Sequence, residues 1–221
     1  MALRKVSVDV IFPVGYDQWT MDSVKWALCS VASQTNKAWR LHVVDATRSQ
    51  NVRTLVEGII PAERLSYNES HTRGAPTLNG LLYEAMCGVK ARFVAYILPG
   101  TCWYQNHLER LMHEMEEGAD VVFMSRESGG KRFPERNAIT PGAAKLWSVM
   151  HRLAHYERTP GFRLGSEDDS ALTLMRGFSK LLDTAWHPII AQIDSPAPHH
   201  VFADVPLGPM KATQLALFQH A

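Results

Sequence analysis

Cysteine is scarce in this chain of 221 residues, where only Cys29, Cys87 and Cys102 occur, widely spaced and odd in number. They fit neither a disulfide framework nor the Cys-Xaa-Xaa-Cys spacing of a metal site, so a reduced compartment is the default. No apolar run approaches the ~20 residues of a membrane span. No basic start followed by an apolar stretch marks a signal peptide. A cytoplasmic protein is therefore the expectation.

The chain also lacks an excess of charge of either sign. Lys plus Arg number 23 and Asp plus Glu number 22, which gives a formal net charge of +1. No overall electrostatic drive toward nucleic acid or an acidic membrane follows, although a local basic patch stays open. The hydrophobic fraction of 46% is too high for a disordered chain, and the length fits one domain with a sizeable core.

Strand and helix patterns alternate over the first part of the chain. β-Branched and aromatic runs predict strands at residues 6–12, 41–45, 65–67, 92–98 and 120–124. Apolar residues at helical spacing predict a helix between each pair of strands, and Asp22 or Ser23 is the expected cap of the first one. This order predicts an α/β fold, with a mostly parallel sheet and helices on both faces.

The character of the sequence changes after Met124. Residues 125–141 are glycine-rich and basic, and they include Arg126, Lys131, Arg132 and Arg136. A helix is predicted next from the spacing of Ala143, Leu146, Trp147, Met150 and Ala154. Another helix is expected to start at the acidic run Glu167-Asp168-Asp169.

In parallel α/β sheets the ligand lies beyond the carboxyl ends of the strands. That rule directs attention to residues 13–17, 45–49 and 98–103, each of which follows a predicted strand.

Several segments, taken in order, resemble family-two glycosyltransferases. Residues 8–14 are similar to the family's opening strand, which ends in Pro, and residues 27–35 resemble its first helix with Ser-Val and Gln-Thr pairs. Residues 39–45 with Ser49 are similar to the second strand and the Asp-Asp-Gly-Ser turn. Arg73-Gly74 and Asn79 resemble the residues that flank the next helix. Residues 93–103 match the central strand, and Glu167-Asp168 match a later acidic pair.

The resemblance implies a GT-A-type, Rossmann-like sheet that binds a nucleoside diphosphate sugar, often UDP-linked. It implies one domain over residues 1–221: a nucleotide-sugar half to about residue 124, an acceptor-side half to about 205, and a tail. It assigns nucleotide-sugar contacts to Pro13, Val14, Gly15, Asp45, Arg73, Asn79, Leu98, Gly100 and Thr101. Asp45 would accept a hydrogen bond from a ring N–H of the base. Read without the family, Asp45 caps a turn at the strand end.

The sequence departs from the family pattern at the metal motif. The family places Asp-Xaa-Asp at the end of the central strand, where carboxylates hold Mg²⁺ or Mn²⁺ against the diphosphate, whereas this chain has Leu98-Pro99-Gly100. Ala46 also replaces the second acidic residue of the turn after strand two. Leucine and glycine side chains cannot ligate a divalent cation. Metal binding stays open, with His199 or His200 as the remaining candidate ligand.

Sugar transfer needs a base for the acceptor hydroxyl and neutralisation of the departing diphosphate. In this inverting family the base belongs to the acidic pair, so Asp168 is the first candidate and Glu167 the second. Their alternative role is capping a helix N-terminus.

Besides a metal ion on His199 or His200, one group of residues is a candidate for neutralising the diphosphate, unless no leaving group departs and the protein is a binding relic. Arg126, Lys131, Arg132 and Arg136 could contact it directly, or they could form a solvated loop. Trp103 could stack on the acceptor, although a core position is favoured for it and for Trp147.

The sequence is compatible with two classes of function, an enzyme and a binding protein. The chain is either a transferase or a nucleotide-sugar-binding relic that has lost catalysis. A nucleotidyltransferase is disfavoured, because no glycine-rich loop with Lys or Arg follows the first strand. The acceptor could be a glycan, a small molecule or a modified nucleic-acid base; the Arg126–Arg136 region alone supports the last.

Overall fold

The computed structural model describes most of the first 157 residues and two short pieces beyond them. The described residues are 6–16, 19–71, 76–124, 126–128, 131–133, 146–157, 162 and 190–193.

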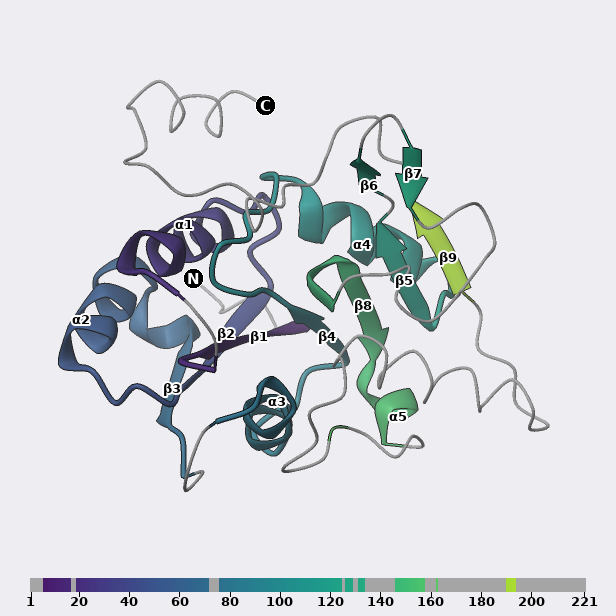
Figure 1. The fold of residues 1–221 in the computed structure, drawn as a ribbon. Helices are drawn as coiled ribbons and strands as arrows, with labels where there is room; N and C mark the ends of the chain where they lie inside the picture. The colour runs from purple at the N-terminus through teal and green to yellow at the C-terminus, as the bar shows by residue number, and fades with distance from the viewer. Residues whose placement is uncertain are drawn as a thin grey trace.

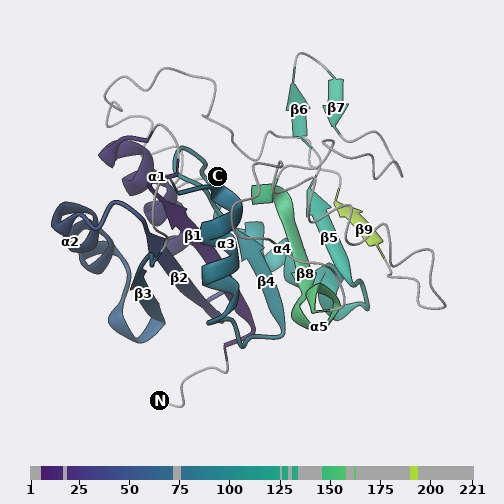
Figure 2. The same ribbon diagram turned by 60° about the horizontal axis from the view of Figure 1, so that its bottom comes forward.

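A seven-stranded mixed sheet forms the centre of the described chain, with strand order β3-β2-β1-β4-β8-β5-β9. Its strands are β1 (Val8–Val14), β2 (Trp39–Asp45), β3 (Leu65–Glu69), β4 (Phe93–Tyr96), β5 (Val121–Met124), β8 (Val149–Arg152) and β9 (Ile190–Ile193). β8 runs antiparallel to its neighbours β4 and β5, and the other strand pairs are parallel (Figure 2). A separate hairpin pairs β6 (Arg126–Ser128) with β7 (Lys131–Phe133). The predicted mostly parallel α/β sheet is confirmed.

Helices cover both faces of the sheet (Figure 1). They are α1 (Met21–Ala32), α2 (Gln50–Ile59), α3 (Leu78–Met86), α4 (His107–Glu116) and α5 (Leu153–Tyr156), with 3-10 turns η1 (Ala62–Arg64) and η2 (Leu146–Ser148). The apolar residues of α1, α2 and α4 pack in one core cluster, and those of α3 and α5 pack in a second. None of the helices within the described ranges has the length and apolar character that crossing a membrane requires.

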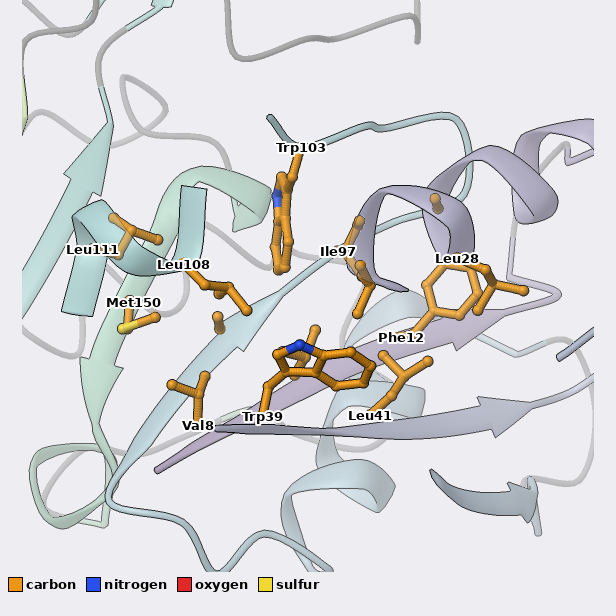
Figure 3. Packing of buried hydrophobic residues seen from close by; sticks show 14 of the residues in the cluster. Val8, Phe12, Leu28, Trp39, Leu41, Ile97, Trp103, Leu108, Leu111 and Met150 are labelled. Atoms are coloured by element: carbon orange, nitrogen blue, oxygen red, sulfur yellow. The ribbon is translucent and has the colours of Figure 1, made fainter. Parts of the chain in front are cut away.

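β1 is buried along its whole length because both of its faces are covered. Val8, Val10, Phe12 and Val14 point into the cluster under α1, and Ile11 points toward α3. A strand that is buried on both sides tends to read as a continuous apolar run, as Val10-Ile11-Phe12 do, and Asp9 is the buried polar exception. Figure 3 shows Phe12 beside Leu28 of α1 and Leu41 of β2.

The N-cap of α1 lies two residues before Asp22 and three before Ser23, the two predicted caps. Thr20 is the N-cap, and its hydroxyl accepts from the Ser23 N–H at 3.1 Å. The Thr20 N–H in turn donates to Ser23 Oγ at 3.0 Å, which completes a capping box. Ser23 is therefore the third helical residue and not the cap.

The helix predicted from Ala143 to Ala154 is wrong in its central part. Val149–Arg152 form the antiparallel strand β8, between the short turn η2 and the single-turn helix α5. Val149 packs in the α3-side cluster and Met150 in the α1-side cluster, so apolar residues occur on both faces of the strand. Such a run lacks the polar alternation that distinguishes a strand from a helix, and its pairing with β4 and β5 decides its conformation.

Asp9 ties the amino ends of the strands together, at the edge opposite the loops considered below. Its Oδ2 accepts from the N–H groups of Lys90 and Ala91 at 2.7 and 2.8 Å. Its Oδ1 lies 3.0 Å from His42 Nε2, and both side chains are almost fully buried. Burial alone raises the pKa of Asp9, but the contact with His42 and the N–H groups of Ala91 and Lys90 together hold it below its ordinary value of 3.8.

We expect Asp9→Asn to weaken the acid sensitivity of folding. The folded carboxyl has a depressed pKa, so its stabilisation is complete above the unfolded pKa and disappears as the pH falls below 3.8. The variant should lose about 1–3 kcal/mol of unfolding free energy at pH 7 and a smaller part of it in acid. Urea unfolding at pH 7 and pH 3.5 measures this difference. The exposed Asp22→Asn is the control, and an unchanged pH dependence in Asp9→Asn would contradict the prediction.

Candidate functional site

The direction of the chain reverses between β1 and β4. From β1 the chain proceeds to β2 and then β3 on one side, and α3 carries it back to β4 on the other side of β1. In open α/β sheets the ligand crevice forms at such a switch point, outside the carboxyl ends of the strands. Residues 13–16, 46–49 and 97–103 follow or end β1, β2 and β4 at this edge.

Pro13 ends the ladder between β1 and β4. The N–H of Ile97 donates to the Ile11 carbonyl at 2.9 Å, so alternate residues of β1 from Ser7 to Pro13 face β4. Pro13 has no N–H to donate on that side, and the pairing of β1 with β4 ends at Ile11. Pairing with β2 continues to Val14 and Asp45. The strands are thus released from each other at the switch point, where a ligand needs room.

Asp45 at the end of β2 is fully buried, and both of its oxygens are hydrogen-bonded. Oδ1 accepts from the N–H and the hydroxyl of Thr47 at 2.8 and 2.6 Å. Oδ2 accepts from the Tyr67 hydroxyl of β3 at 2.5 Å. Burial and the bond to Asp45 raise the pKa of Tyr67, so the phenol stays a donor. This is the turn-capping geometry, with the carboxylate directed into the turn.

Gly15 is required where the end of β1 passes the turn after β2. Its φ is +93°, and a Cβ there would lie 2.7 Å from Thr47 Cγ2. Both facts exclude a larger side chain without movement of the turn. The two loops at the edge therefore have coupled positions, through Thr47.

α1 clamps the loop that follows β4. The Gly100 N–H donates to the Ser23 carbonyl at 3.1 Å. Gln34, which is fully buried, donates from Nε2 to the Tyr104 carbonyl at 2.7 Å and accepts at Oε1 from the Leu108 N–H at 2.9 Å. The second bond caps α4, whose N-cap residue Asn106 makes no side-chain cap bond.

The clamped loop offers no carboxylate to a metal ion. No Asp or Glu occurs between Phe93 and Glu109. Thr101 is 2% exposed. Its hydroxyl donates to the Leu98 carbonyl at 2.7 Å and accepts from the Leu98 N–H at 3.1 Å. Within the described residues, no group of three or more His, Cys, Asp or Glu side chains is arranged to hold a metal ion. The residues at the family's metal position do not fit Mg²⁺ or Mn²⁺.

The remaining predicted nucleotide contacts are partly described. Val14 is buried at the end of β1, and Asn79 is buried in the first turn of α3, which Thr77 caps through the Gly80 N–H. Arg73 lies outside the described residues. The structure thus brings Pro13, Val14, Gly15, Asp45, Leu98, Gly100 and Thr101 to one edge of the sheet.

The predicted base residues lie outside the described residues, as do Arg136, His199 and His200. Phe162 is the described residue nearest to Glu167 and Asp168 in sequence. Its N–H donates to the Tyr156 hydroxyl at 2.9 Å, and its ring packs edge-on against Tyr96 of β4. The chain is therefore attached beside the end of β4, six residues before Asp168.

A buried polar pair lies under Phe162. The Tyr96 hydroxyl lies 2.7 Å from His151 Nε2, and His151 Nδ1 lies 3.0 Å from the Arg152 carbonyl. A carbonyl only accepts, so Nδ1 carries the proton and Nε2 accepts from the tyrosine. Burial raises the pKa of Tyr96 well above its ordinary value, which keeps it a donor. The pair joins β4 to β8.

Trp103 is a core residue, which corrects its assignment as a diphosphate or acceptor contact. It is 1% exposed, stacks on His107 with ring centroids 4.5 Å apart, and lies between Ile97 and Leu108 (Figure 3). The side chain therefore offers no face to a ligand. Trp147 falls in η2, and its side chain is outside the described part of the chain.

Sequence reasoning missed Thr47, Tyr67 and Phe162. Thr47 had a signal, because an Asp followed two residues later by Thr is typical of a capped turn. Tyr67 had none, because its contact with Asp45 depends on the register in which β3 lies beside β2. Phe162 lies between two predicted helices, and only its packing on Tyr96 distinguishes it.

Together these features define a class of protein. It has a mixed α/β sheet in which β1 and β4 stop pairing at the switch point, and the turn after β2 and the loop after β4 are held in place by hydrogen bonds. No family model and no curated protein sequence matches the chain. Solved structures do. S. aureus TarS 1–349 matches with a TM-score of 0.62 at 15% identity, over 87% of this chain and 59% of that one.

Two further structures match to a similar degree. Mannosyltransferase PcManGT from Pyrobaculum calidifontis, solved with GDP-Man and Mn²⁺, has a TM-score of 0.61 at 11% identity, over 98% of this chain and 61% of its own. Glucosyl-3-phosphoglycerate synthase from Mycobacterium tuberculosis, solved with Mg²⁺ and UDP, has a TM-score of 0.59 at 12% identity, over 96% and 75%. The fold of this chain is therefore the GT-A glycosyltransferase fold. The chain spans about three fifths of the length of TarS 1–349 and of PcManGT.

Removal of the Gln34 clamp should destabilise the fold measurably. Gln34→Leu leaves the Leu108 N–H without its acceptor and removes one of the two hydrogen bonds to the Tyr104 carbonyl, which still accepts from the His107 N–H. The expected cost is about 1–3 kcal/mol in unfolding free energy. Chemical denaturation measures the change. Gln50→Leu, at an exposed position, is the matched control, and a loss equal to that of the control would show that Gln34 is not a clamp.

The Asp45–Tyr67 bond should appear as an energetic coupling. Asp45→Ala is expected to lower the unfolding free energy by about 2–4 kcal/mol and Tyr67→Phe by about 1 kcal/mol. Because each variant removes the same bond, the double variant should fall short of their sum by about 0.5 kcal/mol or more. Tyr83→Phe, on an exposed side chain, controls for loss of a hydroxyl. Strict additivity would show that the Asp45–Tyr67 hydrogen bond does not contribute to stability.

Proposed function

We propose that this protein is a glycosyltransferase that moves a sugar from a UDP-linked donor to an acceptor hydroxyl, with inversion at the anomeric carbon. The observation that carries the proposal is the released switch point between β1 and β4 within a GT-A fold. The clamped loop after β4 and the turn after β2 lie at the same edge.

The donor would bind across this edge. Pro13, Val14 and Gly15 present backbone at the end of β1, and residues 98–101 present backbone at the end of β4. Asp45 shapes the turn after β2, on the other side of β1, through its hydrogen bonds with Thr47 and Tyr67. Arg73 and Asn79, before and within α3, complete the proposed nucleotide contacts. The choice of a UDP-linked donor is supported by the structure of TarS 1–349 in complex with UDP-GlcNAc, which matches this chain with a TM-score of 0.59.

Asp168 is the proposed general base, and Glu167 is the second candidate. The acceptor oxygen forms a bond to the anomeric carbon while its proton passes to the Asp168 carboxylate. The bond between that carbon and the diphosphate oxygen breaks, and its electron pair leaves with the nucleoside diphosphate. The contact of Phe162 with Tyr96 supports the assignment. Six residues span at most about 20 Å, so the end of β4 is within reach of Asp168.

A second candidate function is a binding protein that kept the fold and lost catalysis. It is favoured by one observation, the absence of acidic residues between Phe93 and Glu109. Such a protein would bind nucleotide without turning over any donor.

Asp168→Asn should abolish sugar transfer and leave UDP affinity within about twofold, because the amide keeps the shape and loses the proton acceptor. Calorimetry with UDP measures binding, and donor hydrolysis measures turnover when the acceptor is unknown. A thermal-shift screen of nucleotide sugars first identifies the donor, since a ligand of the folded form raises the melting temperature. Asp169→Asn is the matched control.

Two results would decide against these assignments. Normal turnover by Asp168→Asn would exclude it as the base. UDP binding by the wild-type protein, without turnover of any donor, would favour the binding protein.

A further inference from the structure

The diphosphate needs a positive partner that the loop after β4 does not supply. Its Leu98, Pro99 and Gly100 have no ligating side chains, and the Leu98 carbonyl already accepts from Thr101. A nucleoside diphosphate carries about two to three negative charges near neutral pH. The inference below rests on the proposed function and concerns what neutralises this charge.

The topology also brings the basic β6–β7 hairpin to the same edge of the sheet. β5 is antiparallel to β8, which is antiparallel to β4, so β5 points in the same direction as β4. Its carboxyl end therefore lies at the edge where β1, β2 and β4 end. β6 begins two residues after β5 ends, and the β6–β7 hairpin stands beyond that end of the sheet (Figures 1 and 2).

The register of the hairpin sorts its three basic residues onto two faces. Arg126 pairs with Phe133, Glu127 with Arg132, and Ser128 with Lys131. Paired residues share a face and successive residues alternate, so Arg126 and Lys131 lie on one face. Arg132 lies on the other face, where its register partner is the acidic residue Glu127. The register partners of Arg126 and Lys131 are Phe133 and Ser128, so neither of these two basic residues is paired with an acidic one.

We propose that the Arg126–Lys131 face of the β6–β7 hairpin binds the diphosphate of the nucleotide sugar in place of a divalent cation, so that binding and transfer are independent of metal. Two monovalent cations carry the same charge as one Mg²⁺. Guanidinium and ammonium groups donate well to phosphate oxygens. They stabilise the negative charge that develops on the diphosphate oxygen when its bond to the sugar breaks. They do so by charge and hydrogen bonding alone, without transferring a proton.

Metal-free UDP binding is the first test, made on the full chain after treatment with EDTA. UDP affinity and donor hydrolysis should stay within about twofold of the values with added Mn²⁺, because the protein supplies the charge itself. A loss of tenfold or more without Mn²⁺ would overturn the proposal.

The hairpin variants test the named face. Arg126→Gln and Lys131→Gln should each weaken UDP binding about tenfold and leave the binding of uridine, which has no phosphate, unchanged. Arg132→Gln, on the opposite face of the same hairpin, is the matched control and should stay within about twofold of wild type. Equal losses in all three variants, or none in the first two, would overturn the assignment.

The outcomes separate this inference from the proposed function. If the wild-type protein binds neither UDP nor uridine, the proposed function fails, and the inference fails with it. If the wild-type protein binds UDP and hydrolyses donors but needs Mn²⁺, only the inference fails. Thermal melting of each variant shows whether a loss of binding comes from loss of the fold.

Discussion

The missing N–H of Pro13 is the constraint on which the candidate site depends. β1 is paired on both sides up to Ile11, and beyond that residue only β2 still pairs with it. Because the proline faces β4, the ladder on that side cannot continue, and the ends of the two strands are released where the chain direction reverses. The end of the pairing is therefore a consequence of backbone chemistry within a fully buried strand.

Hydrogen bonds and one glycine fix the other two segments of this edge, the turn after β2 and the loop after β4. Asp45 directs its charge into its own turn and toward Tyr67, and Gly15 allows the turn to approach β1. On the other side, Ser23 and Gln34 of the α1 region hold the loop after β4 by its backbone. Carboxylates and amides at this edge thus act within the protein, and the loop after β4 adds no charged side chain for a ligand. The β6–β7 hairpin is a basic element that the topology places at the same edge.

Prediction from sequence succeeded where the pattern is local. The alternation from β1 to β5 was predicted because the helices show apolar residues at helical spacing and most of the strands are rich in apolar residues. It failed at β8, whose residues Val149 and Met150 are buried on opposite faces and give no alternation of polarity. The Gln34-Thr35 pair was recognised by resemblance, yet its role as a cap for α4 depends on a loop about 70 residues away in the chain.

The sequence by itself determined the α/β class, the proline near the end of the first strand and the absence of acidic residues between Phe93 and Glu109. These follow from periodicity and residue chemistry, which need no knowledge of neighbours. Only the tertiary structure decided that Trp103 is core, that Asp45 bonds Tyr67, and that Arg126 and Lys131 share a face without Arg132. Each of these depends on which distant strands pair and in what register, and strand pairing is set by the packing of the whole sheet.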